Sequence, residues 1–211
     1  MADLQIIGIP QSSYTWAIRM ALAEKGVAYD LLSTPPHSPE IDAIHPLGKV
    51  PAMRHGDVAL FESKAIASYI DRVFPGPRLI PNDARGAAEV EQWVSHVNTA
   101  VDPCLVRTYI LGYFFPQTAD GKPDRAAIEG ALPAMQKHID LLDKAVARTG
   151  YLAGDGFTFA DINLMPILYY TQRFPEGGKM VGAAGHLSAY FARHAERPSF
   201  KATTPPPPPG R

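Results

Sequence analysis

The sequence is poor in cysteine, in net charge and in long apolar runs, and each shortage excludes a class of protein. A single cysteine, Cys104, cannot form an internal disulfide or a CxxC redox or metal pair. A chain without structural disulfides is typical of a reducing compartment. The formal net charge of −1 provides no long-range attraction for nucleic acid or an anionic membrane. We therefore expect neither as a partner.

Targeting signals and metal-ligand clusters are also missing. The start, MADLQIIGIPQSS, has Asp3 where a signal peptide carries basic residues, and its apolar run is short. No apolar stretch approaches the roughly 20 residues that a membrane-spanning helix needs. The histidines are scattered, so we expect no bound metal. These observations favour a cytoplasmic protein.

The first eighty residues alternate short apolar runs with helical patterns. The order is strand, helix, strand, short helix, hairpin and helix, which predicts a mixed four-stranded sheet flanked by helices. The expected strands lie at 4–8, 29–32, 50–54 and 58–61, and the expected helices at 14–25, 40–44 and 63–73.

Strand patterns almost disappear after the Pro-rich turn near residue 77. Apolar residues then recur at helical spacing, and Thr158 followed by Asp161 is typical of a capping box at a helix start. We expect helices at 83–112, 124–148, 158–173 and 186–195. The proline run 205–209 cannot continue a helix or a sheet, so it predicts a disordered or extended tail.

Two segments of the first half could carry chemistry. Ser12-Ser13 opens the first expected helix, where a serine is a preferred cap and needs no further role. Val50-Pro51 opens what should be an interior strand, an uncommon place for proline. A cis bond there would turn the chain and leave the peptide groups of Val50 open to a ligand, whereas a trans bond would be an ordinary strand start.

A third segment, Glu62-Ser63, joins a strand directly to a helix. The helix start offers N–H groups that suit a carboxylate, and the acidic side chain suits an ammonium. Together they describe a site for an α-amino acid group. The plain alternative is a serine cap preceded by a solvated glutamate.

Several motifs in this order resemble those of the cytosolic glutathione S-transferase superfamily. Residues 45–52, HPLGKVPA, are similar to its NPxGKVPA stretch, with His45 in place of the usual Asn, a change that we interpret as loop capping. Residues 61–70, FESKAIASYI, are similar to its ESxAIxxYL helix, and 157–161, FTFAD, to its capping box. The start of the first helix, SSYTW at 12–16, resembles the serine-type motif of phi- and zeta-like members. Among family members, we expect a bacterial one of this serine type.

The resemblance implies an α/β thioredoxin-like N-terminal domain of order βαβαββα, followed by an all-α domain. The expected boundaries are 1–80 for the glutathione-binding domain, 81–86 for a linker, 87–203 for the helical domain and 204–211 for the tail. It also implies a homodimer. The activity would be transfer of glutathione, the co-substrate, to a small apolar electrophile.

Roles for single residues follow from the same resemblance. Glu62 and Ser63 would hold the γ-glutamyl end of glutathione, and the backbone of Val50, beside Pro51, would pair with its cysteinyl part.

The rest of the implied site lies on loops and on the first helix. Lys49 and, with less support, His37 would face the glycine carboxylate. Ser12 would donate a hydrogen bond to the sulfur, with Ser13 as a close alternative and Tyr14 as a weaker one.

The electrophile pocket is expected on the helix at 83–112. Arg107, Tyr109 and Tyr113 gather there near Phe114, and Ser13 and Tyr14 would complete the pocket from the first domain. Aromatic residues at helical spacing are equally typical of a core, so this set has two interpretations.

Three other functions share this pattern. A thiol–disulfide or dehydroascorbate reductase would have cysteine at the Ser12 position, and Cys104 is instead interpreted as a packed helix residue. A glutathione-dependent isomerase of the maleylacetoacetate type fits the serine motif but has cysteine where Tyr14 stands. A non-catalytic interaction protein commonly loses the serine or the Glu-Ser pair, and both are present.

Overall fold

The computed structural model describes residues 3–206, which form two compact units. The first unit runs as far as Pro81 and includes the chain again from Glu196, and the second is Asn82–Ala195. The first unit therefore contains the predicted α/β region and also the described residues from Glu196 to Pro206.

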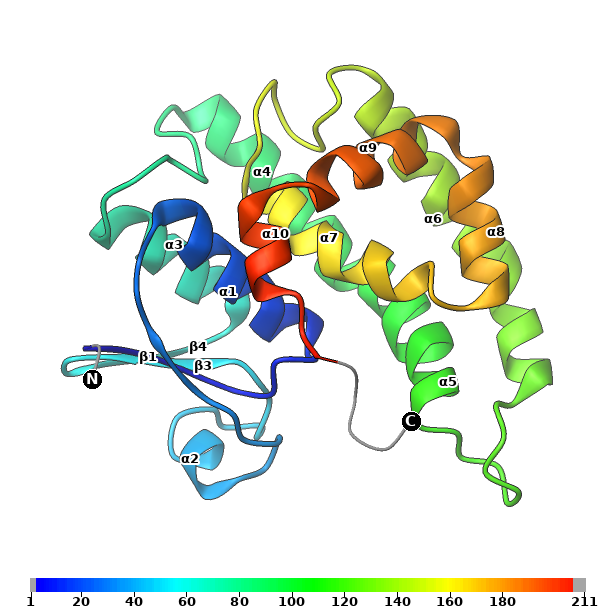
Figure 1. Cartoon of the computed structure of the whole chain (residues 1–211), viewed down its shortest axis with the longest axis horizontal. Coiled ribbons are helices and arrows are strands. Elements are labelled where there is room, and N and C mark those ends of the chain that lie inside the picture. The colour runs from blue at the N-terminus through cyan, green and yellow to red at the C-terminus, as the bar shows by residue number, and fades with distance from the viewer. Residues whose placement is uncertain (1–2, 207–211) are drawn as a thin grey trace. The chain divides into compact units, whose positions relative to one another are not determined.

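A four-stranded mixed sheet forms the centre of the first unit (Figure 1). Its order is β2-β1-β3-β4, with β1 parallel to β2 and antiparallel to β3, and with β3 antiparallel to β4. This confirms the predicted sheet. The strands are β1 (Leu4–Ile7), β2 (Asp30–Leu32), β3 (Ala52–His55) and β4 (Val58–Phe61).

Helices cover both faces of this sheet. On one face α1 packs beside α3, and α2 lies on the other (Figure 1). Successive residues of a strand point to opposite faces, so buried Ile6 and Ile7 serve both layers. On the α2 side, Ile7 packs with Ile41 and Ala52. The bounds are α1 (Ser13–Lys25), α2 (Pro39–Asp42) and α3 (Ser63–Val73).

A buried ion pair fastens the ends of α1 and α3. The Lys25 ammonium donates to Asp71 Oδ1 at 3.2 Å, and both side chains are almost fully buried. Asp71 also accepts backbone hydrogen bonds from Leu79 at 2.8 Å and Ile80 at 3.3 Å. A buried carboxylate is stable only with such partners, so Asp71 holds the segment that closes the α/β region.

A helix near the C-terminus, α10 (Pro198–Thr203), packs against α1 in the first unit. The Trp16 indole N–H donates to Thr203 Oγ1 at 3.0 Å, and the Trp16 and Phe200 rings lie 5.0 Å apart. The Arg197 guanidinium makes two hydrogen bonds with Glu24, at 2.8 and 2.6 Å. From the sequence, residues up to 203 were expected in the helical domain. Contacts that span most of the chain leave no local pattern, so the return of α10 to the first unit could not be predicted.

The residues after α10 follow the first unit as well. Pro205 is buried, and the Pro206 carbonyl accepts a hydrogen bond from the Gln11 side chain at 3.3 Å. The start of the tail, whose residues 204–211 were expected to be disordered or extended, is therefore placed as far as Pro206. The remaining positions, 207–211, lie outside the described residues.

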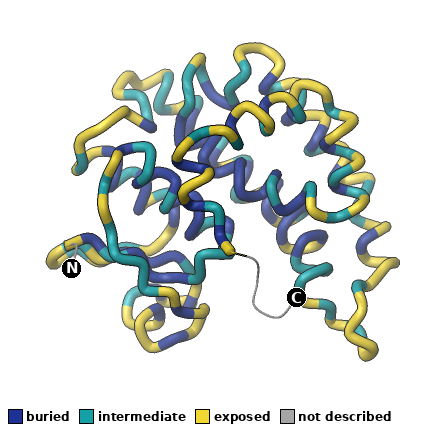
Figure 2. The backbone as a smooth tube through the Cα atoms, viewed as in Figure 1, coloured by how far each residue is buried: buried dark blue, intermediate teal, exposed yellow. Residues whose placement is uncertain are grey.

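The second unit is helical, as predicted, and is built around α7 (Phe159–Thr171). Nearly every residue of α7 is buried, as Figure 2 shows in dark blue. A helix that is apolar on all sides needs such surroundings. The other helices are α4 (Ala84–His96), η1 (Val97–Ile110), α5 (Leu111–Phe114), α6 (Arg125–Ala147), α8 (Pro175–Ala183) and α9 (Gly185–Ala195).

The capping box that opens α7 is confirmed. Asp161 Oδ2 accepts from Thr158 N–H at 2.9 Å and from its hydroxyl at 3.1 Å. Asp161 Oδ1 accepts from Leu152 N–H at 2.8 Å and from the Tyr190 hydroxyl at 2.9 Å. Asp161 thus joins the start of α7 to the preceding loop and to α9.

Two helical features of the second unit differ from the prediction. The expected helix at 83–112 is α4, then η1, then α5, with η1 wound as a wider π-helix that contains Pro103. Proline lacks an N–H and crowds the carbonyl four residues earlier, so a regular α-helix is disfavoured at this point. The sequence also missed α8, whose glycines are poor helix formers. Gly177 is nevertheless required, because a Cβ there would lie 2.2 Å from the Thr171 carbonyl oxygen.

Among residues 3–206, no helix is long and apolar enough to cross a membrane.

Candidate functional site

The strand register brings the three predicted segments of the first unit to the same end of the sheet. Ile7 pairs with Ala52, and Ala52 pairs with Phe61. The loop to Ser12, the Val50-Pro51 turn and the Glu62-Ser63 junction each adjoin one of these paired residues. They therefore surround the same end of the central strands.

Ser12 is the N-cap of α1. Its hydroxyl oxygen accepts a hydrogen bond from Thr15 N–H at 3.4 Å, while the hydroxyl hydrogen can still donate to a ligand. The first turn of α1 contains no acidic residue, so the positive end of the helix is not neutralised there. Ser12 is half-buried, whereas Ser13 is buried and Tyr14 is half-buried. Of the two serines, Ser12 is the more accessible.

Gly8 lets the Ser12 loop approach the Val50 turn. Its φ of +149° is a conformation that favours glycine, and a Cβ at this position would lie 2.8 Å from Thr15 Oγ1 and 3.0 Å from Val50 Cβ. The start of α1 and the turn before β3 therefore both pack closely against Gly8. The sequence did not single out Gly8, because the need for it appears only once the three segments meet.

The Val50–Pro51 peptide bond is cis, one of the two isomers that the sequence left open. Val50 is half-buried and Pro51 is buried. Outside the helices and strands, no backbone hydrogen bond among the described residues involves Val50. Its N–H and C=O can therefore pair with an extended ligand placed beside Val50 at this end of the sheet.

Glu62 and Ser63 form the junction between β4 and α3. Glu62 has a φ of +67°, a conformation that a non-glycine residue adopts at an energetic cost, and its side chain is 69% exposed. Ser63 is the first residue of α3 and is buried. The junction thus presents a carboxylate beside the N–H groups of a helix start.

The loop before the cis bond contains His37, His45 and Lys49. His37 has a φ of +60°, its N–H donates to the Gly48 carbonyl at 2.9 Å, and its ring is exposed. Lys49 is exposed. His45 is buried, and its Nδ1 accepts from Leu47 N–H at 3.1 Å, which is the loop-capping role expected for it. Both predicted carboxylate-binding residues are therefore accessible from solvent.

The second unit contains the residues predicted for the electrophile pocket, but it divides them. Tyr109 is fully buried, and its hydroxyl donates to Glu176 Oε2 at 3.0 Å. Tyr113 donates to the same oxygen at 2.7 Å. Arg107 is not part of this group and pairs with Asp102 at 2.9 Å.

The sequence missed the centre of this tyrosine group. Glu176, in the first turn of α8, also pairs with Arg125 at 2.6 Å. Burial opposes ionisation of Glu176, yet hydrogen bonds from Tyr113 and Arg125 bring its pKa down to about 2. Burial, reinforced by Glu176, raises the pKa of Tyr109 and of Tyr113. The ring centroids of Phe174 and Tyr113 lie 4.2 Å apart in a stacked arrangement, so this group also takes part in packing the helical unit.

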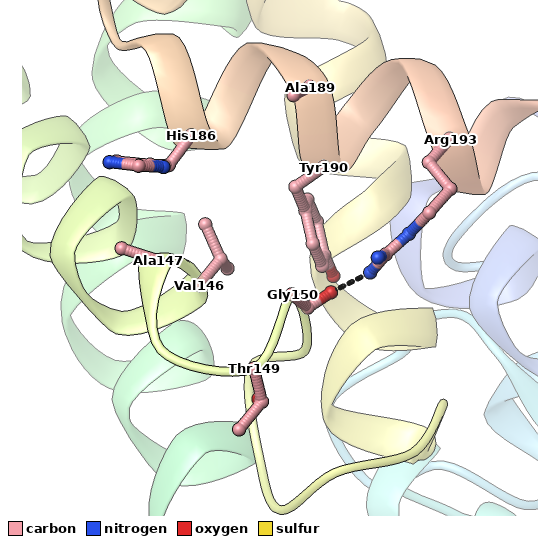
Figure 3. Close-up of a pocket in the computed structure, with 8 residues that line it drawn as sticks. All are labelled: Val146, Ala147, Thr149, Gly150, His186, Ala189, Tyr190 and Arg193. Carbon is pink, nitrogen blue, oxygen red and sulfur yellow. Dashed lines mark hydrogen bonds between the residues drawn. The ribbon is translucent and has the colours of Figure 1, made fainter.

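A hollow of about 340 Å³ on the second unit is unrelated to these residues (Figure 3). The Arg193 guanidinium at its rim donates to the Gly150 carbonyl, and the Tyr190 hydroxyl is held by Asp161. These two polar side chains are thus already engaged within the protein. The hollow is lined by Val146, Ala147, Thr149, Gly150, His186, Ala189, Tyr190 and Arg193.

In the part of the chain that the structure describes, no three His, Cys, Asp or Glu side chains form a group that could hold a metal ion.

Fold and site together define a thioredoxin-like domain with a ligand edge at a cis-proline, followed by a helical domain. Comparisons with known families and proteins agree with this two-domain description. The model of the glutathione S-transferase N-terminal domain matches residues 6–78, and that of the C-terminal domain matches 101–198. Glutathione S-transferase 3 of Zea mays is 34% identical over 99% of this chain and 98% of its own length. The chain belongs to the glutathione S-transferase family.

Solved structures give the same result. Glutathione transferase F7 of Populus trichocarpa superimposes with a TM-score of 0.86 at 28% identity, over 95% of this chain and 97% of that one. The theta class glutathione S-transferase of Xanthomonas axonopodis pv. citri, solved with glutathione bound, has a TM-score of 0.81 at 26% identity, over 96% of this chain and 97% of that one.

Family membership confirms four predictions from the sequence: the fold, an enzyme, transfer of glutathione, and glutathione as the co-substrate. The maize relative is a plant enzyme, so it does not support the bacterial part of the expectation.

Proposed function

We propose that this glutathione transferase binds its co-substrate along the edge formed by Val50-Pro51 and Glu62-Ser63, and activates the thiol with Ser12. The observation that carries the proposal is the register Ile7–Ala52–Phe61, because it gathers all three segments at one place. The Glu62 carboxylate suits the ligand ammonium, and the start of α3 suits its carboxylate. Lys49 and His37 then face the glycine end.

One hydroxyl and one helix start supply enough free energy for thiol activation. A free thiol has a pKa of about 8.5, so only about 3% is ionised at pH 7. Lowering that pKa by about 2 units takes roughly 2.7 kcal/mol. A hydrogen bond to a charged group contributes about 1.5–3 kcal/mol, and a helix N-terminus about 0.3–1 kcal/mol. Ser12, as N-cap of α1, combines both contributions.

A titration of bound glutathione tests the role of Ser12. The absorbance of the thiolate is followed against pH in the wild type, in Ser12→Ala and in Ser13→Ala. We expect the thiol pKa to rise by about 1–2 units in Ser12→Ala, the loss of one charged hydrogen bond, and to stay low in Ser13→Ala. An unchanged thiol pKa in Ser12→Ala contradicts the assignment, and a rise in Ser13→Ala alone transfers the role to Ser13.

The structure favours a transferase over a protein-thiol reductase. Cys104 lies on η1 in the second unit, and burial raises the pKa of its thiol. A raised pKa leaves less of the reactive thiolate at neutral pH. A redox role would require the opposite environment.

The proposal also covers the class of the enzyme, its oligomeric state, its location and its second substrate. We infer a serine-type enzyme of phi-like or zeta-like class, a homodimer, a cytoplasmic location and a small apolar electrophile. Tyr14 and Tyr113 are the half-buried members of the predicted pocket set. Analytical ultracentrifugation tests the dimer, and a sedimentation coefficient of a monomer at micromolar concentration contradicts it. Conjugation of a generic aryl halide tests the electrophile class.

A further inference from the structure

His45 is a buried imidazole that bridges two parts of the candidate site. Its ring is 4% exposed, and it lies between the loop before the cis bond and the β4–α3 junction. On the loop side Nδ1 accepts from Leu47 N–H at 3.1 Å. On the junction side Nε2 is 4.0 Å from Glu62 Oε1, and the ring is 4.8 Å from that of Phe61.

The Leu47 hydrogen bond determines which nitrogen of His45 carries the proton. A nitrogen that accepts an N–H cannot itself be protonated, so in the neutral imidazole the hydrogen resides on Nε2. Nε2–H then faces the Glu62 carboxylate. The same arrangement, in which one nitrogen is fixed by a backbone group and the other faces a carboxylate, sets histidine orientation in many sites.

Glu62 needs such support because little else orients it. Its side chain is 69% exposed, and its backbone has a φ of +67°. An exposed glutamate samples several rotamers, and selecting one of them costs free energy when a ligand binds. A fixed N–H dipole on one side of the carboxylate reduces that cost.

We propose that His45 is a positioning residue for Glu62, and thereby sets the preference of the site for a ligand with a free α-ammonium group. This inference rests on the proposed function, because it assumes that Glu62 binds the γ-glutamyl ammonium. His45 does not contact the ligand in this scheme. It acts through the carboxylate that does.

Two substitutions separate this role from loop capping. In His45→Asn the amide oxygen can replace Nδ1 as the acceptor for Leu47 N–H, but the shorter side chain does not reach Glu62. In His45→Gln the amide nitrogen can replace Nε2–H towards Glu62, but the acceptor for Leu47 is lost. His45→Asn therefore keeps the hydrogen bond from Leu47 N–H, and His45→Gln keeps an N–H that faces Glu62.

The test is calorimetric titration of the full chain with glutathione and with its des-amino analogue, glutaryl-cysteinyl-glycine. The measured quantity is the ratio of the two dissociation constants. We expect His45→Asn to weaken glutathione binding by about two- to fivefold, the range of one exposed charge contact, and to leave the analogue unchanged. We expect His45→Gln to retain the wild-type ratio, even where its melting temperature falls.

A double-mutant cycle with Glu62→Gln provides the decisive control. If His45 acts through Glu62, then His45→Asn has no further effect on the ratio in the Glu62→Gln background. Additive effects, or an unchanged ratio in His45→Asn, overturn the positioning role while wild-type binding of glutathione leaves the proposed function intact. Failure of the wild type to bind glutathione overturns both.

Discussion

Glu62 and His37 are the non-glycine residues with positive φ among residues 3–206, and both lie at the candidate site. Such conformations cost free energy and persist where the surrounding structure requires them. Residue types and motifs predicted both as binding residues. Their backbone conformations could not be predicted, because these depend on how β4 enters α3 and on how the loop at 45–48 closes.

Gly48 shows how tightly that loop is packed. It has a φ of +62°, and a Cβ there would lie 2.1 Å from His37 Nδ1. We expect Gly48→Ala to lower the free energy of unfolding by about 2–4 kcal/mol and to weaken glutathione binding, because the His37 ring must move. Chemical denaturation and calorimetry measure the two effects.

Gly56 is the matched control for this substitution. It has a similar φ of +57°, but nothing lies within 4 Å of the position of its Cβ. Gly56→Ala should cost only the conformational part, about 1–2 kcal/mol, and leave binding unchanged. Equal losses of stability in the two variants would contradict a clash at Gly48.

His138 should make the protein sensitive to mild acid. Burial and the neighbouring imidazole of His96, 5.8 Å away between ring centres, lower the pKa of His138. The unfolded chain therefore takes up a proton near pH 6.5 that the folded chain resists, so stability is full above that pH and falls as the pH decreases below it. The slope is at most about 1.4 kcal/mol per pH unit.

His138→Gln should flatten this decrease between pH 7 and pH 5. Urea denaturation at a series of pH values measures it. His186→Gln, at an exposed position on α9, serves as the control and should keep the wild-type slope. If the slope is the same in His138→Gln and in the wild type, the acid sensitivity has another origin.

At the scale of elements, local sequence predicted those helices whose signals are local. The N-cap Ser12, the ending at Gly26 and the capping box at Thr158 each lie within one turn of the helix they delimit. The winding of η1 and the existence of α8 were not predictable in this way. Gly177, for example, is explained by its contact with the Thr171 carbonyl rather than by helix propensity.

Among the residues that cap helices, Asp161 should cause the largest loss of stability when it is replaced. It accepts four hydrogen bonds from Thr158, Leu152 and Tyr190, and it is fully buried. Asp161→Ala leaves these donors without partners, so we expect a loss of about 3–5 kcal/mol in the free energy of unfolding. Asp124→Ala is the matched control, because this exposed N-cap of α6 accepts one bond, from Ala127 N–H at 3.0 Å, and should cost about 1 kcal/mol. Comparable losses in urea denaturation would contradict a special role for Asp161.

At the scale of the whole molecule, the first unit is discontinuous in sequence. Its α/β region ends at Pro81, and α10 joins it from the other end of the chain. This arrangement was not predictable, because the Trp16–Thr203 hydrogen bond spans 187 positions. The mixed four-stranded sheet, by contrast, followed from the strand pattern.

Removal of the chain after Ala195 should therefore destabilise the α/β unit rather than the helical unit. Trp16 would lose its acceptor and its contact with Phe200, and Glu24 would lose Arg197. We expect earlier proteolysis within residues 3–81 and a red-shifted emission of Trp16, measured with Trp93→Phe as the background. A control chain that ends at Pro206 should resemble the full protein. If the cleavage sites of the shorter chain lie first in 82–195, the packing of α10 contributes little.

The position of α10 also has a consequence during synthesis of the protein. A ribosome produces the sheet and α1 early, yet Thr203, the acceptor for the Trp16 indole, follows its donor by 187 positions. The helical unit is complete in sequence before Thr203 is made, whereas the α/β unit is not. The α/β unit can therefore be completed only after residues 196–203 have been synthesised, so a nascent chain stalled before residue 196 should be a folded helical domain attached to an unfinished, chaperone-accessible one.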